Sequence, residues 1–370
     1  MNNPTLDPHD FASRVGTWLL ARGPESDVVV SCRARLARNI TGFAFGTRLA
    51  EKQAKELAAR VRKALEADPI DGQETVWIDL AGASDLERLL LRERHLVSRE
   101  LAPVEERRAS PPGRAVAFAR GETALAMVGE EDHLRLGGIA PGFDLGLAFD
   151  RVRALDLALE ARLDFAVDER LGYLTACPTN VGTGLRASVM LHLPALGLVR
   201  SELEKVFNAA QRTGLAVRGQ YGEGSRASGD LYQISNQVTL GRNESELVGD
   251  LETLVPDIIR FERQLRTALL EDRRAELDDR ISHALGLLCN TQTISTDAAL
   301  GHLSTVRLGV ALGSVDDFAL EELNALSVQI QKGHVQALSD DSPVAALMDA
   351  PQRDRLRATL LQRFFARRNP

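Results

Sequence analysis

The sequence predicts an α+β fold, in which an antiparallel β-sheet flanked by helices is followed by an all-helical region. Segments in which apolar and polar residues alternate, as they do in half-buried strands, recur from about residue 28 to about residue 240. From Glu244 onward, leucine and isoleucine recur at helical spacing instead. We therefore expect a lead-in over residues 1–26, a mixed domain over 27–256 and a helical domain over 257–370, with a kink or interruption at Pro256.

The bulk composition indicates an ordinary soluble protein. The chain has 370 residues and a formal net charge of −7, so a basic surface for nucleic acid is not expected. No apolar run reaches membrane-spanning length, and the N-terminus lacks the basic and then apolar pattern of a signal peptide. Three scattered cysteines form neither a CxxC pair nor a disulfide framework. We therefore expect a cytoplasmic protein without a structural zinc site.

The first strong strand pattern begins at Asp27 and contains two arginines on one face. Its apolar face is formed by Val28, Val30, Cys32, Ala34 and Leu36. Ser31, Arg33 and Arg35 share the other face, where the two guanidinium groups lie side by side and repel each other unless an anion lies between them. The face is therefore either a solvated surface with salt-bridge partners or a phosphate clamp, for which the planar fork of arginine is suited.

Several amphipathic segments predict helices around this strand. Helices are expected over residues 50–66, 144–160 and 201–214. Another helix begins after Ser84, because Ser84 and Glu87 can form a capping box, and it runs toward His95. A lone imidazole such as His95 is by itself more often structural than functional.

A polar cluster follows two short apolar strands. Residues 114–119 and 123–128 predict adjacent strands around a glycine turn, and the second leads into the sequence GEEDHLRL. Alternation brings Glu131, His133 and Arg135 onto one face. Such a cluster is either an internal salt-bridge network, or a site where the carboxylate holds or deprotonates a cation and the arginine holds an anion.

A glycine-rich loop enters the next strand at Cys177. After the loop, Arg186, Ser188, Met190 and His192 alternate on one face of a predicted strand. A thiol, a backbone-rich loop and an arginine at the mouth of a strand are typical of the floor of a polyanion site.

A second glycine-rich loop follows Arg218, carries Glu223 near its centre and ends in a strand from Leu231. It is either a loop that closes over a ligand or an exposed hairpin loop with a solvated glutamate.

The motifs SCRAR, EEDHLR, CPTNVGTGLRASV, RGQYGE and ISNQ occur in the order and approximate spacing found in the guanidino (phosphagen) kinases, which this chain resembles. The resemblance is closest to the bacterial protein-arginine kinases of the McsB type. The helical N-terminal domain of the phosphagen kinases is missing, and a long C-terminal extension is present. The extension contains RDRLRA at residues 353–358, which matches the RDxxRA signature associated with phosphoarginine recognition in that branch.

The resemblance implies that ATP binds at the arginine-bearing strands. Five permanent cations, Arg33, Arg35, Arg135, Arg186 and Arg218, would surround the phosphates, and His95 would lie against the base. Mg²⁺ would be held by phosphate oxygens and water, so no protein metal ligands are expected. The residues that the resemblance assigns to nucleotide binding are Ser31, Cys32, Arg33, Ala34, Arg35, His95, Arg135, Arg186, Ala187, Ser188, Val189, Met190, Arg218, Gly219, Gln220, Tyr221, Gly222 and Glu223.

The resemblance also implies an acceptor site for a guanidinium group. Glu131 and Glu223 would flank the guanidinium, Cys177 would lie beside it, and Glu131 would accept its proton, because a protonated guanidinium is not a nucleophile. In the C-terminal extension, Arg353, Asp354, Arg357 and Ala358 would bind phosphoarginine. A basic amphipathic end helix without such a site is the alternative there.

The expected activity is therefore phosphorylation of arginine in proteins, using ATP. The resemblance further implies a role in stress response, in which proteins are marked for a Clp protease, together with a zinc-binding activator, a homodimer and allosteric control. A kinase for a small guanidino compound such as free arginine is the nearest alternative. A catalytically silent adaptor that binds phosphoarginine belongs to a different class, and the presence of both glutamates and all five arginines argues against it.

Overall fold

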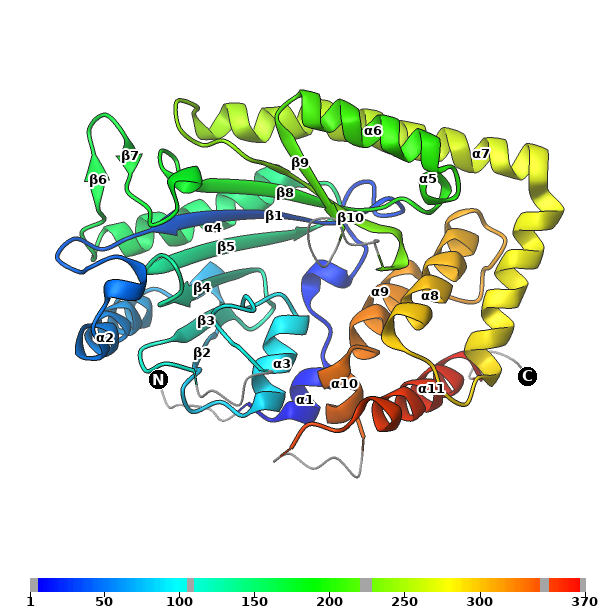
Figure 1. The fold of residues 1–370 in the computed structure, drawn as a ribbon, viewed down its shortest axis with the longest axis horizontal. Coiled ribbons are helices and arrows are strands. Elements are labelled where there is room, and N and C mark those ends of the chain that lie inside the picture. The colour runs from blue at the N-terminus through cyan, green and yellow to red at the C-terminus, as the bar shows by residue number, and fades with distance from the viewer. Residues whose placement is uncertain (1–5, 105–109, 220–227, 340–345, 367–370) are drawn as a thin grey trace.

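The computed structural model describes residues 6–104, 110–219, 228–339 and 346–366. Its centre is an eight-stranded sheet with the strand order β2-β3-β4-β5-β1-β8-β10-β9, in which all neighbours are antiparallel (Figure 1). The strands are β1 Val29–Arg38, β2 Thr75–Asp79, β3 Ala115–Ala119, β4 Ala124–Val128, β5 Leu134–Pro141, β8 Leu185–His192, β9 Leu215–Gly219 and β10 Leu231–Asn236. A small hairpin of β6 (Val167–Asp168) and β7 (Gly172–Tyr173) stands apart from the sheet. The predicted α+β fold is confirmed.

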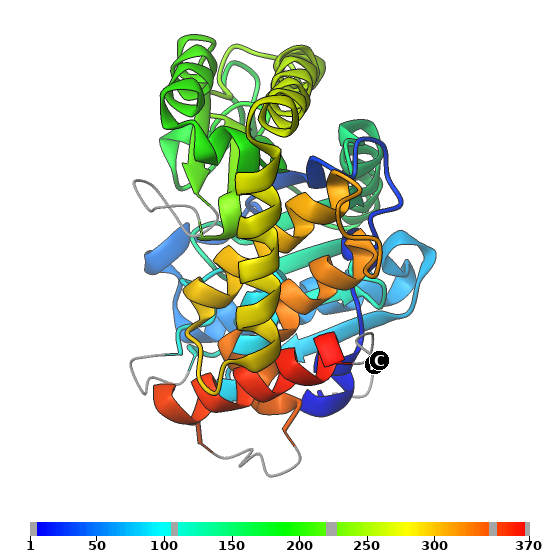
Figure 2. The same ribbon diagram turned by 90° about the vertical axis from the view of Figure 1, so that its right-hand side faces the viewer.

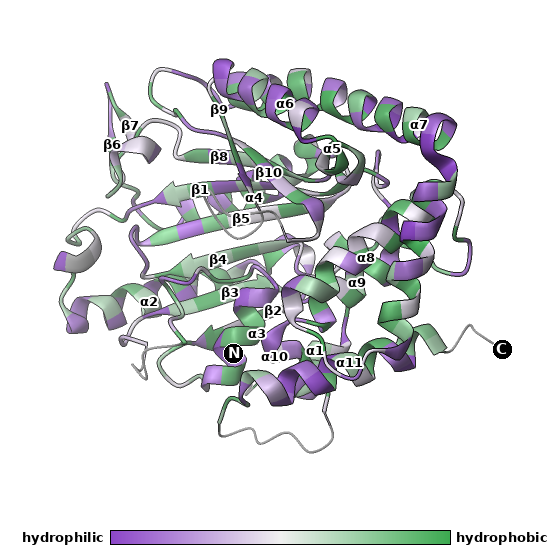
Figure 3. Ribbon diagram, turned by 45° about the vertical axis from the view of Figure 1, so that its right-hand side comes forward, coloured by the Kyte–Doolittle hydropathy of each residue, from purple (hydrophilic) through white to green (hydrophobic). Residues whose placement is uncertain are grey.

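Two hydrophobic cores lie on opposite faces of the sheet. All residues of β3 and β4 are buried, and because successive side chains of a strand point to opposite faces, they supply residues to both cores. The ribbons of both strands are largely hydrophobic (Figure 3). The first core packs against α2 (Glu51–Ala67), α4 (Leu145–Glu160), α6 (Arg200–Arg212) and the first part of a long helix, α7. The second core packs against α1 (Pro8–Ser13) and α3 (Asp85–Glu93).

The start of α3 follows the predicted capping box. The Ser84 Oγ accepts a hydrogen bond from the Glu87 backbone N–H at 3.2 Å, and the Glu87 carboxylate accepts one from the Ser84 N–H at 2.7 Å. The short helix α5 (Pro194–Leu198) was not predicted from the sequence.

The helical region consists of α7 (Glu244–Asn290), α8 (Thr296–Ala311), α9 (Leu320–Gln329), α10 (Lys332–Ala337) and α11 (Ala350–Ala366). The kink or interruption expected at Pro256 is not an interruption, because α7 continues through Pro256 and leaves helical geometry at Arg273, where φ is −140° and ψ is 34°. The chain changes direction in this part of α7 (Figures 1 and 2). A third core lies among the second part of α7, α8 and α11. None of the helices in the described part of the chain is both long and apolar enough to cross a membrane.

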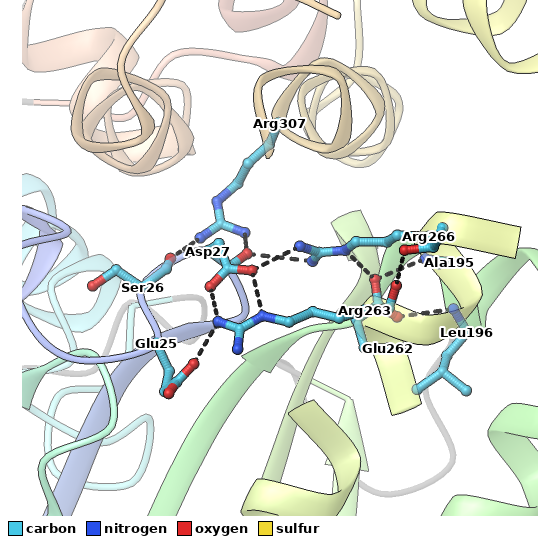
Figure 4. Close-up of polar contacts among 10 residues, drawn as sticks. Glu25, Ser26, Asp27, Ala195, Leu196, Glu262, Arg263, Arg266 and Arg307 are labelled. Carbon is cyan, nitrogen blue, oxygen red and sulfur yellow. Dashed lines mark hydrogen bonds and ion pairs between the residues drawn. The ribbon is translucent and has the colours of Figure 1, made fainter. Parts of the chain in front are cut away.

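Asp27, two residues before the start of β1, joins the helical region to the sheet. Its carboxylate accepts hydrogen bonds from Arg263 at 2.5 and 3.1 Å and from Arg266 at 3.0 Å (Figure 4). Arg307 of α8 donates to the Asp27 and Ser26 carbonyls at 3.2 and 2.9 Å. Burial would raise the pKa of the Asp27 carboxyl, but its hydrogen bond to Arg263 and the charges of Arg263 and Arg266 lower it overall.

We predict that Asp27→Asn lowers the free energy of unfolding by about 3 kcal/mol at pH 7, because the arginines lose their shared counter-ion. Since the folded-state pKa of Asp27 is lowered, its contribution is present above its unfolded pKa and disappears as the pH falls through the folded value. Urea unfolding at pH 7 and at progressively lower pH measures both effects, and the difference from wild type should shrink in acid.

Asp257→Asn is the matched control, because Asp257 lies on α7 and pairs with Arg260 at an exposed position. Its unfolding midpoint should stay at the wild-type value. Equal stability of wild type and Asp27→Asn at pH 7 would contradict the role of Asp27.

Candidate active site

Five arginines lie on one face of the sheet, contributed by four strands. Arg33 and Arg35 of β1 lie opposite Ser188 and Arg186 of β8. In β5, Arg135 is paired with Ala37, which shares the face of Arg33 and Arg35. In β9, Arg218 is paired with Gln233 of β10, which in turn lies opposite Met190 on the same face. The alternation within β1 and β8 and the pairing register with β5, β10 and β9 therefore bring the five arginines to one face.

Among the described residues, Arg135 on this face forms an ion pair with a carboxylate, whereas Arg33 and Arg35 form none. Arg135 donates to both oxygens of the Glu130 carboxylate, at 2.9 and 3.0 Å. Burial, assisted by the charge of Arg135, lowers the pKa of Arg33 to about 10. Burial and the neighbouring guanidinium groups also lower the pKa of Arg35 well below its usual value. The buried Nε atoms of Arg33 and Arg35 have no hydrogen-bond partner in the described structure, which suits a site for a polyanion.

A cavity of about 910 Å³ opens over this face. Arg33, Arg35, Arg135 and Ser188 line one side of it, and Ser31 and Met190 also reach it. The adjoining part is apolar, with the side chains of Trp18, Val30, Val97, Met127 and Ile139. A charged part beside an apolar part fits a nucleotide, whose base is largely apolar and whose phosphates are anionic.

His95 lies where the two parts of the cavity meet. Its ring packs edge-to-face on Trp18 with 5.9 Å between the ring centroids, and its carbonyl accepts a hydrogen bond from the Arg33 Nη2 at 2.9 Å. Burial and the charges of Arg33 and Arg35 lower the pKa of His95 to about 4, so the ring is neutral at neutral pH.

Several residues assigned to the nucleotide by motif position face the other way. The first core buries the side chains of Cys32, Ala34, Ala187 and Val189. Successive side chains of a strand point to opposite faces, so these four lie on the face opposite the arginines. They can approach a nucleotide only through their backbone. Gly219 ends β9, whereas Gln220, Tyr221, Gly222 and Glu223 lie outside the described residues.

Glu131 lies at a second hollow of about 730 Å³, next to Phe45, Glu130, Thr175 and Ala176. Its side chain is exposed. The expected alternation of Glu131, His133 and Arg135 is wrong, because β5 begins only at Leu134 and residues 130–133 form a turn.

The turn is held by buried polar side chains. His133 accepts a hydrogen bond from the Ile40 N–H at Nδ1 and lies 2.9 Å from the Ala44 carbonyl through Nε2, so it is structural. Asp132 accepts hydrogen bonds from Asn39 at 2.7 Å and from the Ala176 N–H at 2.6 Å. These contacts hold the segment that carries Glu131 against the segment that carries Cys177.

Cys177 begins the short 3₁₀ turn Pro178–Asn180. Its Sγ lies 3.0 Å from the Thr179 Oγ1, and its carbonyl accepts a hydrogen bond from the Thr175 Oγ1 at 2.7 Å. Ala176, its neighbour in sequence, lines the hollow with Glu131, so the two predicted acceptor residues belong to one region.

The C-terminal motif opens into the far end of the same 910 Å³ cavity, which the sequence did not indicate. Arg353, Asp354 and Arg357 line it. The predicted pairing of Asp354 with Arg357 is present, at 2.5 Å. Arg357 is only 1% exposed, and it also donates to the Ile330 and Ile294 carbonyls at 2.7 Å each, so it supports the fold. Ala358 is packed in the third core and does not line the cavity.

Comparison with known proteins agrees with this site. Residues 56–265 match the family model for the ATP:guanido phosphotransferase C-terminal catalytic domain. Residues 274–370 match the model for the protein-arginine kinase McsB C-terminal domain.

The curated relatives include proteins named protein-arginine kinase. The one from Geobacillus stearothermophilus is 39% identical over 95% of this chain and 94% of its own length. The one from Halothermothrix orenii is 41% identical over 93% of this chain and 95% of its own. The one from Bacillus subtilis is 38% identical over 96% of this chain and 94% of its own length.

Solved structures show the same fold. A lombricine kinase aligns with a TM-score of 0.56 and 28% identity over 72% of this chain and 73% of that chain. The duplicated taurocyamine kinase of Schistosoma mansoni aligns with a TM-score of 0.58 and 23% identity over 85% of this chain and 50% of that chain. The arginine-lined sheet face, the family model and the full-length relatives lead to one conclusion: this chain belongs to the ATP:guanido phosphotransferase family.

Proposed function

We propose that this chain is a protein-arginine kinase, which transfers the γ-phosphoryl group of ATP to arginine side chains of proteins. The observation that carries the proposal is the face of five arginines beside the turn that holds Glu131. The choice of protein arginine as acceptor is supported by relatives of that name, which align with both the sheet and the helical region.

In this proposal the arginine face binds the ATP phosphates, and the apolar part of the cavity with His95 takes the base. Guanidinium groups at fixed positions stabilise negative charge on the transferring phosphoryl group without reorganisation, and such stabilisation accounts for most of the catalysis expected in phosphoryl transfer. Mg²⁺ would neutralise further phosphate charge. By the resemblance to the guanidino kinases, phosphate oxygens and water would be its ligands.

The acceptor guanidinium binds between the Glu131 turn and Cys177. As a guanidinium nitrogen forms a bond to the γ-phosphorus, the bond from that phosphorus to the bridging oxygen of ADP breaks. Glu131 takes the proton that the nitrogen loses. Glu223 would act as the second orienting carboxylate and Cys177 as a neighbour of the guanidinium. The products are ADP and phosphoarginine.

A phosphoarginine site at the C-terminal motif is the second part of the proposal. Arg353 and Arg357 line the far end of the cavity, together with Ser295 and Thr296 at the N-terminal end of α8. Guanidinium groups and a helix N-terminus both favour a phosphoryl group, and Asp354 can pair with the guanidinium part of the ligand. Ala358 contributes by packing α11 rather than by contact.

The cellular setting belongs to the same proposal. We expect a cytoplasmic enzyme, acting as a homodimer, that marks proteins for a Clp protease during stress and responds to a zinc-binding activator. These expectations rest on the resemblance to McsB-type kinases.

The test of the activity is incubation with Mg-ATP and an arginine-rich unfolded protein, with free arginine in parallel. Products are identified by mass spectrometry without acid, because the N–P bond is acid-labile. Phosphate on protein arginine supports the proposal. Phosphate on free arginine alone would identify a small-molecule guanidino kinase, and ATP binding without either product would favour an adaptor.

We predict that Glu131→Gln lowers the rate of transfer by about 10²–10⁴-fold, because the amide cannot accept the proton. ATP binding, measured by titration calorimetry, should remain at the wild-type value. The matched control is Glu169→Gln, an exposed glutamate in the β6–β7 hairpin, which should leave the rate unchanged. Normal turnover in Glu131→Gln would exclude Glu131 as the base.

For the C-terminal site, Arg353→Ala should weaken phosphoarginine binding by about tenfold or more, because a charge-assisted contact is lost. The fold should be retained, because Arg353 is only half-buried and its hydrogen bond goes to the nearby Met348 carbonyl. Arg357→Ala should in addition reduce stability, because the Ile294 and Ile330 carbonyls lose their donor. Unchanged phosphoarginine affinity in Arg353→Ala would show that the end helix is only structural.

A further inference from the structure

The helical region supplies one wall of the cavity that faces the arginines. Ser327 and Val328 of α9 and Gln331 and Lys332 at the start of α10 line the cavity opposite the sheet. Val328 is also a member of the second core, in which Trp18 and Val30 of the opposite wall are buried. The shape of the cavity therefore depends on how the helical region is held against the sheet domain.

Glu93, the last residue of α3, lines the cavity and contacts the helical region. Its carboxylate accepts hydrogen bonds from the Gly333 N–H at 2.8 Å, the His334 N–H at 3.0 Å and the His334 Nδ1 at 2.7 Å. His334 is fully buried, and the Glu93 side chain is 9% exposed. A Cβ at position 333 would lie 3.0 Å from the Glu93 Oε2 and from the Leu89 Cγ, so glycine permits this close approach.

The same carboxylate lies two residues before His95. The turn from Arg92 to Leu96 closes with hydrogen bonds from the His95 N–H to the Arg92 carbonyl and from the Leu96 N–H to the Leu91 carbonyl. His95 has a φ of 58°, which a non-glycine residue keeps only where surrounding contacts impose it. The His95 carbonyl in turn receives the hydrogen bond from Arg33.

Two anchors impose this turn from opposite sides. Arg94, within the sheet domain, is buried and pairs with Glu122, and its Nη1 donates to the Arg14 carbonyl at 2.7 Å. Glu93 provides the other anchor, and the hydrogen bonds that fix its carboxylate come from α10 of the helical region. Arg94 is thus held by residues that precede the helical region, whereas the position of Glu93 depends on the position of α10.

We propose that Glu93 is a positioning residue through which the helical region holds the His95 turn, and with it Arg33, in the geometry that binds the nucleotide. The inference rests on the proposed use of ATP by this site. Movement of α10 would shift Glu93, the turn and the Arg33 guanidinium together, because they are connected by hydrogen bonds and two peptide units.

The test uses the full chain with Glu93→Gln. The amide can accept at one oxygen but cannot accept the remaining hydrogen bonds from Gly333 and His334. The KM for ATP, and the dissociation constant for ATP from calorimetry, should rise by about tenfold, the effect of losing one hydrogen bond to a charged acceptor. The KM for the arginine acceptor should stay within about twofold, because Glu131 and Cys177 lie at the other hollow.

Glu87→Gln is the matched control, since it makes the same change on the same helix, and glutamine can still form the capping box. Its KM for ATP should be that of the wild type. His334→Ala removes the other partner of the hydrogen bond to Glu93 and should also lower the affinity for ATP. His334→Asn keeps a side-chain donor and should restore most of that affinity. If Glu93→Gln does not fold, the ATP affinities of His334→Ala and His334→Asn test the role of the Glu93 contact instead.

Loss of stability in Glu93→Gln with unchanged ATP affinity would overturn the inference, because Glu93 would then only tether the two regions. Equal loss of ATP and acceptor affinity would overturn it as well. If ATP affinity falls as expected while protein arginine is not phosphorylated even by the wild type, the inference stands and the proposed acceptor fails.

Discussion

Guanidinium groups that share one face of a sheet repel one another, and this repulsion is the constraint on which the rest of the molecule depends. In the register of β1, β5, β8, β9 and β10, all five arginines project to the same side. Such an arrangement persists only if the strands cannot shift or twist apart. The two cores on either side of the sheet provide that rigidity, since every residue of β3 and β4 is buried.

Several carboxylates near the sheet form ion pairs with arginines that are not on this face. Asp156 holds Arg38, Glu122 holds Arg94, and Asp27 holds the arginines of α7. On the arginine face itself, Glu130 pairs with Arg135. Arg33 and Arg35 are left facing a cavity, with their pKa values lowered by burial and by neighbouring guanidinium groups. Among the described residues no carboxylate pairs with Arg33 or Arg35, and their buried Nε atoms have no hydrogen-bond partner. Such groups are costly, so the site suits an anionic ligand at the expense of stability.

The helical region is part of this site rather than an appendage. Asp27 attaches α7 and α8 to the start of β1, and Glu93 attaches α10 to the turn beside His95. Three of the five arginines, Arg33, Arg35 and Arg135, consequently line one continuous cavity with the C-terminal motif. The helices of this region that line the cavity follow the sheet domain in the sequence.

The sequence by itself determined what local periodicity can encode. Alternation predicted that Arg33 and Arg35 share a strand face, Ser84 and Glu87 predicted a helix start, and the ordered motifs identified the family. Only the tertiary structure decided that His133 is a structural side chain, that Arg357 is buried on carbonyls of other helices, and that the break in α7 lies at Arg273 rather than Pro256. These outcomes depend on where a strand begins and on contacts between residues far apart in the chain, which periodicity within a short segment does not contain.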